Sequence, residues 1–213
     1  MVTLAYLCGS VSWAVILTRA RTGREIREMG NLNAGTANVA RTVGKGLAAL
    51  VFFLDGLKVL APLFLARFIA FGGDSPRDSL GLFATAIAAV IGHVRPLFFE
   101  LKGGAGAAAT LFAYLFFVPV EVLGCAVIAF LIVMVFLRGR PYAFGRWIPM
   151  IFSLLTPFVV LIDSALVDIH LVGRVSIGGH PWHVTAGVFA LSLLLLAVNR
   201  RVILSELRRL RSR

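Results

Sequence analysis

Two segments of the chain combine glycine, asparagine and cationic residues in a pattern suited to binding phosphate. The first covers residues 25–46 and reads EIREMGNLNAGTANVARTVGKG. Glycine lets backbone amides turn toward a ligand, and asparagine offers both donors and acceptors. The planar guanidinium of Arg41 fits a phosphate group, which makes it a candidate catalytic residue. The candidate substrate-binding residues of this segment are Gly30, Asn31, Asn33, Gly35 and Asn38.

The second segment covers residues 102–110, reads KGGAGAAAT, and leads directly into an apolar stretch. Small residues at a helix N-terminus expose backbone amides to an anion, and the helix dipole favours negative charge there. Lys102 adds a point charge and is a second candidate catalytic residue. Gly103, Gly104 and Gly106 are candidate substrate-binding residues. Close packing of helices is the alternative role for such small residues.

Three ionisable residues lie inside otherwise apolar segments. Asp55 and Lys58 are spaced i, i+3, which places them on one face of a helix. An isolated charge in mid-membrane costs about 2.5–3.5 kcal/mol, so we expect them to pair, either as a structural ion pair or in a functional role. His93 is a third candidate catalytic residue, with a hydrogen bond between helices as the alternative. Asp163 receives no role.

The elements that position these residues are membrane-spanning helices. Hydrophobic residues make up 59% of the 213 residues and charged residues 15%, and the mean hydropathy is +0.92. In soluble proteins about half of the residues are hydrophobic and about a quarter are charged. The apolar residues form runs long enough to cross a bilayer. We therefore predict an all-α, polytopic integral membrane protein with a single domain over residues 1–213.

About seven transmembrane helices are expected. The segments are 2–18, 47–71, 80–99, 107–118, 120–137, 147–166 and 182–198. Pro119 separates the fourth from the fifth, because proline cannot continue a helix without the loss of a backbone hydrogen bond. The chain after Asn199 looks like a short basic helix with Leu204, Leu207 and Leu210 at helical spacing, which we expect along an anionic leaflet.

The distribution of charge predicts an N-terminus outside and a C-terminus in the cytoplasm. With that orientation, the inner segments hold 16 of the 21 Lys and Arg residues, as the positive-inside rule requires. They include Arg138, Arg140, Arg146, Arg200, Arg201 and Arg213, whereas the outer loops hold Asp74, Asp78, Glu121, Asp168, Arg77 and Arg174.

Composition and pattern also exclude several classes of protein. The net charge of +11 does not indicate nucleic-acid binding, because the basic residues lie between apolar segments rather than on a polar surface. Cys8 and Cys125 lie within apolar runs, and no disulfide framework or metal-ligand spacing is present, so no metal is expected. The N-terminal segment lacks the basic start of a cleavable signal peptide.

Several of these residues occur in the order of a known family. The chain resembles the bacterial acyl-phosphate:glycerol-3-phosphate acyltransferases, usually called PlsY. In that family the first loop reads roughly DIRExGSGNxGxTNxxRxxG, against EIREMGNLNAGTANVARTVG here. The family's D-x-x-K pair matches Asp55 and Lys58, and its GH followed by FKGGKGxAT matches Gly92, His93 and LKGGAGAAAT. An early Gly-Ser pair also recurs, as Gly9 and Ser10.

The resemblance implies a multi-pass enzyme of the bacterial inner membrane with its active-site loops in the cytoplasm. Such enzymes transfer a fatty acyl group from acyl phosphate to glycerol 3-phosphate, giving lysophosphatidic acid and inorganic phosphate. The implied partners are membrane lipid, acyl phosphate and a small phosphorylated acceptor, and no cofactor is implied. An acyl phosphate is already activated, so phosphate positioning and charge stabilisation supply much of the catalysis.

The chain departs from the family pattern at positions that bear on activity. The residues that differ are Asn31 for serine, Leu32 for glycine, Ala37 for threonine, Ala105 for lysine and Asn199 for histidine. The family's third motif has no counterpart in RGRPYAFGR, which begins at Arg138. These losses motivate an alternative, a non-catalytic subunit of a larger membrane complex. A transporter is less favoured, because the segments show no pairing of broken helices in two halves.

Overall fold

The computed structural model describes residues 1–137, 139, 143–166, 170–171, 175–176 and 180–211. The predicted charges Arg138, Arg140, Asp168, Arg174 and Arg213 lie outside these residues. The helices are α1 (Val2–Gly9), α2 (Trp13–Thr22), α3 (Thr36–Thr42), α4 (Lys45–Ile69), α5 (Pro76–Val94), α6 (Ala107–Phe117), α7 (Pro119–Ile132), α8 (Ala143–Leu166), α9 (Trp182–Val198) and α10 (Arg200–Arg211). Shorter elements are η1 (Ile26–Glu28), η2 (Leu97–Phe99), the π-helical turn η3 (Val133–Leu137), and the antiparallel pair β1 (His170–Leu171) and β2 (Val175–Ser176).

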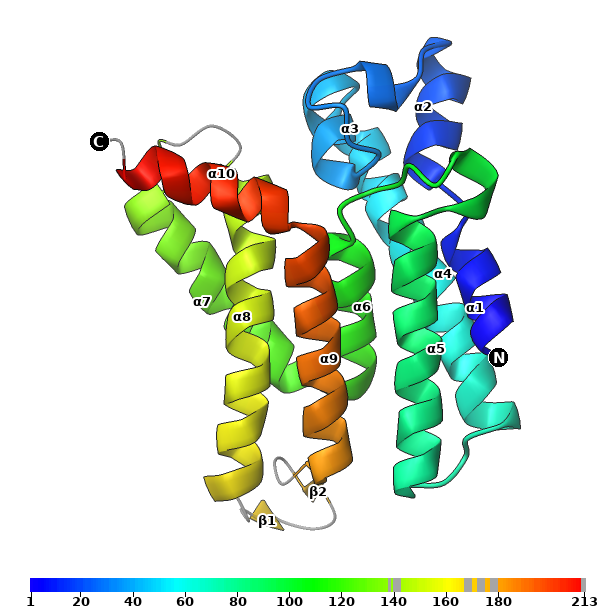
Figure 1. The fold of residues 1–213 in the computed structure, drawn as a ribbon, viewed down its shortest axis with the longest axis vertical. Helices are drawn as coiled ribbons and strands as arrows, with labels where there is room; N and C mark the ends of the chain where they lie inside the picture. The colour runs from blue at the N-terminus through cyan, green and yellow to red at the C-terminus, as the bar shows by residue number, and fades with distance from the viewer. Residues whose placement is uncertain (138, 140–142, 167–169, 172–174, 177–179, 212–213) are drawn as a thin grey trace.

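The predicted all-α membrane architecture is confirmed. Helices α4 to α9 run up and down a bundle, and α2, α3 and α10 lie at the same end of it (Figure 1). Within the bundle α1 packs along α5, α4 contacts α5 and α6, and α8 contacts α7 and α9. Large apolar side chains such as Phe53, Phe68 and Phe136 remain more than half exposed on its outside, as a lipid-facing surface allows.

The apolar helices coincide with the predicted segments. Five stretches are long and apolar enough to cross a membrane, namely Val2–Thr22, Lys45–Ile69, Pro76–Phe99, Pro119–Leu137 and Phe144–Ala165. Ala107–Phe117 and Trp182–Val198 are shorter apolar helices. The number of crossings and their orientation stay predictions. The turn predicted at Pro119 is confirmed, because α6 ends at Phe117 and Pro119 begins α7.

The first apolar segment differs from the single run expected over residues 2–18. Its helix breaks between α1 and α2, at Ser10–Ser12, and then continues to Thr22. The helix α1 meets α5 at close range, since a Cβ on Gly9 would lie 2.2 Å from the carbonyl oxygen of Ala89. The break frees the carbonyl of Val11, which accepts a hydrogen bond from Lys58 Nζ at 2.6 Å. A charged side chain thus satisfies the backbone that the break exposes.

The basic tail forms the expected helix. Helix α10 turns sharply away from α9 and crosses the end of the bundle (Figure 1). Leu204 is exposed, while the side chains of Leu207 and Leu210 lie outside the described part of the structure. Placement of α10 along a membrane leaflet stays a prediction.

Candidate active site

A cavity of about 820 Å³ opens at the end of the bundle that carries α2, α3 and α10. Both glycine-rich segments, the start of α8 and the junction of α9 with α10 contribute to its wall. Six cationic residues line it, and none of the described lining residues is acidic. These cations are Arg41, Arg95, Lys102, Arg146, Arg200 and Arg201. The apolar part of the wall comes from Ile91, Val94, Pro149, Met150, Leu194 and Leu195.

Asn38 shapes the first segment from inside. Its buried side-chain nitrogen donates to the carbonyls of Ile26, Met29 and Asn33 at 3.2, 2.9 and 3.0 Å. Its side-chain oxygen accepts a hydrogen bond from the backbone amide of Asn31 at 3.1 Å. Because one side chain satisfies four backbone groups, the loop is held in a single conformation. Asn31 and Asn33 line the cavity, whereas Asn38 holds the loop behind them.

Backbone conformation explains Gly30. It has a φ of +58°, and a Cβ there would lie 2.2 Å from the side-chain oxygen of Asn38. Leu32, two residues further on, also has a positive φ, of 63°, although it is not glycine. That conformation is unfavourable for a branched side chain. The family pattern has glycine at this position, so the substitution by leucine adds strain to the loop.

In the second segment, Gly103 and Gly104 pack directly against His93. Their amides donate to the carbonyls of Val94 and His93 at 3.1 and 3.2 Å. A Cβ on Gly103 would lie 2.0 Å from the His93 carbonyl oxygen, and one on Gly104 would lie 2.3 Å from His93 Nε2. These two amides therefore already have acceptors, and the absence of side chains permits close packing. In the first turn of α6, Ala107 lines the cavity, and first-turn amides have no acceptor within their own helix.

His93 belongs to a buried network behind this loop and does not line the cavity. Its Nδ1 lies 3.6 Å from Asp55 Oδ1, which also pairs with Lys58 Nζ at 3.0 Å. Lys58 in turn donates to Val11 at the break between α1 and α2. The network thus joins α4, α5 and the helix break. Of the two roles left open for the Asp55–Lys58 pair, this geometry supports the structural one. The catalytic role of His93 stays a prediction.

Arg27 connects the two glycine-rich segments. Its Nη1 donates to the carbonyls of Phe99 and Lys102 at 2.9 and 3.4 Å. Glu25 orients it through an ion pair of 3.0 Å with its Nε. The guanidinium of Arg27 is thus hydrogen-bonded to the backbone of the second segment and paired with Glu25 in the first. These charge-assisted contacts fix the two loops relative to each other. Sequence analysis did not single out Arg27, because its contacts with residues 72 and 75 positions along the chain leave no local signal.

Lys102 extends from the loop with most of its side chain exposed. Its Nζ lies 3.2 Å from Glu100 Oε2, and this hydrogen bond holds the pKa of Glu100 below its ordinary value. Arg41 belongs to α3 and lies near the start of α8, since a Cβ on Gly145 would lie 3.5 Å from Arg41 Nη1. Both cations line the cavity, one from each glycine-rich segment.

The structure brings together most of the predicted site residues and adds others. Arg41, Lys102, Asn31, Asn33, Gly103 and Gly104 line the cavity. Gly30, Gly35, Asn38, Gly106 and His93 lie outside its lining. Sequence reasoning interpreted Arg146, Arg200 and Arg201 as topology charges and did not single out Arg95. These four arginines lie at or near the ends of apolar segments, at the ends expected on the same side as the two glycine-rich loops, and this position could have indicated that they join the site. Arg138 and residues 140–142 of the RGRPYAFGR stretch lie outside the described residues.

Comparison with known proteins identifies the family. A family model described as glycerol-3-phosphate acyltransferase matches residues 1–207. A glycerol-3-phosphate acyltransferase of Myxococcus xanthus is 38% identical over 128 residues, which are 60% of this chain and 64% of that protein. The chain spans about half to two thirds of the curated relatives that it matches.

Solved structures give a likeness over nearly the whole chain. The crystal structure of PlsY, an integral membrane glycerol 3-phosphate acyltransferase, in its glycerol 3-phosphate form matches with a TM-score of 0.68 and 29% identity. The match covers 97% of this chain and 90% of that one. The lysophosphatidic acid form of PlsY matches with a TM-score of 0.66, 28% identity and the same coverage. With a family model that matches almost its full length, the chain belongs to the glycerol-3-phosphate acyltransferase family.

Proposed function

We propose that this multi-pass membrane protein transfers a fatty acyl group from acyl phosphate to glycerol 3-phosphate, or to a related small phosphorylated acceptor, in phospholipid synthesis. The observation that carries the proposal is the character of the cavity. Six cations line it without an acidic residue among the described lining, and an apolar wall lies beside them. Both proposed substrates carry phosphate, and one of them carries a long apolar chain.

Each part of the cavity has a part of the substrates to bind. Arg41 and Lys102 approach from the two glycine-rich segments, where guanidinium and ammonium groups suit phosphate oxygens. Ala107, the first residue of α6, lines the same cavity, and a helix N-terminus favours negative charge. The apolar wall formed by α5, α8 and α9 suits the acyl chain. Asn31 and Asn33 supply hydrogen bonds for the hydroxyl groups of the acceptor.

The reaction needs no nucleophile from the protein. A hydroxyl oxygen of the acceptor attacks the carbonyl carbon of the acyl phosphate, and the bond from that carbon to the phosphate oxygen breaks. No Asp, Glu or His is among the described residues that line the cavity, so the departing phosphate takes the hydroxyl proton. Cations around the phosphate stabilise the charge that develops on it, and binding both substrates in one cavity supplies proximity.

The lost lysine at Ala105 is offset by charge from other elements. Arg95 follows α5, Arg146 lies in the first turn of α8, and Arg201 lies in α10, and all three line the same cavity as Ala105. The summed field of these groups attracts anions even though one position of the family pattern is neutral. The comparisons give no support to the alternative of a non-catalytic subunit, and no protein partner is proposed.

The test is turnover by purified protein in detergent micelles. With acyl phosphate and glycerol 3-phosphate, we expect lysophosphatidic acid and inorganic phosphate in equal amounts. Glycerol is the matched control acceptor, because it has the hydroxyls and lacks the phosphate. Equal rates with glycerol, or release of phosphate without an acylated product, would contradict the proposal.

A further inference from the structure

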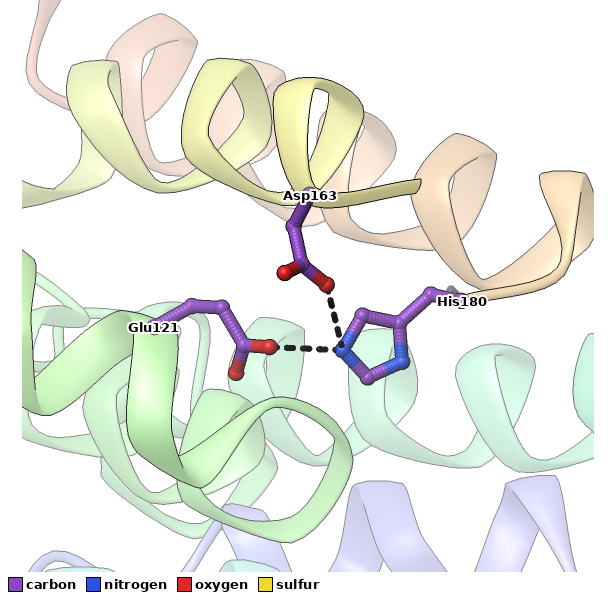
Figure 2. A group of neighbouring side chains, drawn as sticks. All are labelled: Glu121, Asp163 and His180. Carbon is purple, nitrogen blue, oxygen red and sulfur yellow. Dashed lines mark hydrogen bonds and ion pairs between the residues drawn. The ribbon is translucent and has the colours of Figure 1, made fainter. Parts of the chain in front are cut away.

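A second group of ionisable side chains lies at the end of the bundle opposite the cavity. Glu121 is in the first turn of α7, Asp163 is near the end of α8, and His180 lies two residues before the start of α9. Figure 2 shows that the three side chains point toward one another from separate elements. His180 Nε2 lies 2.7 Å from Glu121 Oε1 and 3.9 Å from Asp163 Oδ2. One donor atom from each residue falls within 4.8 Å of the other two.

The group is shielded from solvent and carries excess negative charge. The side chains of Glu121, Asp163 and His180 are 9%, 17% and 22% exposed. A protonated imidazole compensates one carboxylate and leaves the second uncompensated. Asp163 Oδ2 is buried and has no hydrogen-bond partner among the described residues. Such an oxygen is costly to bury unless a further positive group binds it.

The two carboxylates share a single imidazole. His180 Nε2 lies within hydrogen-bond distance of Glu121 Oε1, at 2.7 Å. A single proton placed between these two residues still leaves Asp163 without a donor. A divalent ion at the centre of the group would balance both carboxylates, and each residue would supply one ligand atom.

We propose that Glu121, Asp163 and His180 bind a divalent transition-metal ion of the Zn²⁺ class. Zn²⁺ takes imidazole nitrogen and carboxylate oxygen at about 2.0–2.2 Å, which separates the ligand atoms of a tetrahedral site by about 3.3–3.6 Å. The observed separations of 2.7 and 3.9 Å lie on either side of that range. Mg²⁺ and Ca²⁺ prefer sites made entirely of oxygen, so an imidazole ligand selects against them.

The ion would join elements that are distant in sequence. Helices α7 and α8 and the segment that precedes α9 would each supply one ligand, so the ion would tie these three elements together. An ion that binds only the folded protein stabilises it by mass action. The start of α7, the end of α8 and the start of α9 lie at the end of the bundle opposite α3 and α10 (Figure 1), whose residues line the cavity. The role is therefore structural and independent of the proposed reaction.

Metal titration of the full chain tests the inference. Tag-free protein in detergent micelles, stripped with EDTA, should bind one equivalent of Zn²⁺ at neutral pH and melt several degrees higher. Asp163→Asn, which keeps the side-chain shape, should weaken binding at least tenfold, as loss of a ligand does. Asp74→Asn is the matched control, because Asp74 is an exposed carboxylate outside the group. Equal affinity in the two variants, or an equal shift with Mg²⁺, would overturn the inference.

A spectroscopic measurement keeps the inference testable if a variant does not fold. Co²⁺ added to the unchanged protein should produce the visible absorption of a tetrahedral site, and one equivalent of Zn²⁺ should remove it. A spectrum unchanged from that of aqueous Co²⁺ would overturn the inference without any substitution.

Discussion

The side-chain amide of Asn199 donates a hydrogen bond to the backbone carbonyl of Ala105, at 2.9 Å. The same amide also donates to the carbonyl of Leu195 at 2.9 Å, so it joins the end of α9 to the second glycine-rich segment. Both Asn199 and Ala105 are positions at which the chain departs from the family pattern. Two of the departures are therefore in contact, and together they hold the wall of the cavity.

Replacement of Asn199 tests this contact. In Asn199→Asp the carboxylate cannot donate and faces two carbonyl oxygens. Loss of hydrogen bonds at a partly buried site costs about 1–3 kcal/mol, so kcat/KM should fall by about tenfold or more. Asn199→Ala, which removes the donor without adding a charge, should have a smaller effect. Kinetics of the two purified variants decide this, and a fully active Asn199→Asp would show that the contact is dispensable.

The variant Ala105→Lys restores the cation of the family pattern. Because the cavity already holds six cations, one more charge at this half-buried position should raise kcat/KM by less than about tenfold. Steady-state kinetics measure the change. The control is Ala70→Lys, an exposed position just after the last residue of α4 that does not line the cavity. A gain of a hundredfold would mean that the other cations do not replace the missing lysine.

If Lys102 binds substrate phosphate as proposed, Glu100, which forms an ion pair with Lys102 at 3.2 Å, should compete with substrate for it. Removal of its carboxylate in Glu100→Gln should lower the KM for the phosphorylated acceptor by a few fold, as expected for an exposed pair. Lys102 holds the pKa of Glu100 below 4.5, so the carboxylate stays ionised at higher pH. The difference in KM should then be constant from about pH 6 to 8. A difference that changes across this range would assign it to another group.

The Asp55–Lys58 pair should act as a unit in stability. Lys58→Met leaves Asp55 buried without its partner, which costs about 3–5 kcal/mol. Asp55→Asn combined with Lys58→Met removes both charges and should cost less than Lys58→Met alone. Denaturant unfolding in micelles measures the free energies of unfolding of the unchanged protein, of Asp55→Asn, of Lys58→Met and of the double variant. If the double variant loses the sum of the two single losses, the pair is not coupled.

Much of the fold could be predicted from the sequence, because the membrane strongly constrains which structures can span it. Runs of about 20 apolar residues and the position of Pro119 predict helices and their turns. The break between α1 and α2 could not be predicted from the sequence. It depends on the packing of Gly9 against α5 and on Lys58, which lies 47 residues from Val11.

Part of the candidate site was predictable from the sequence, because the composition of its loops indicates phosphate binding. Arg41, Lys102, Asn31 and Asn33 lie in loops whose composition is itself the signal. The roles of Asn38 and His93 as scaffold depend on which neighbours they contact, and composition does not carry that information. The group of Glu121, Asp163 and His180 is assembled from three elements, so no local spacing could indicate it.

Removal of Arg41 tests the central claim most directly. The rate of lysophosphatidic acid formation from acyl phosphate and glycerol 3-phosphate should be measured for Arg41→Ala and for the control Arg77→Ala, which lies in the first turn of α5 at the opposite end. We expect kcat/KM to fall by at least about a hundredfold in Arg41→Ala and to be unchanged in Arg77→Ala. Equal rates in the two folded variants would contradict a phosphate-binding cavity built around Arg41.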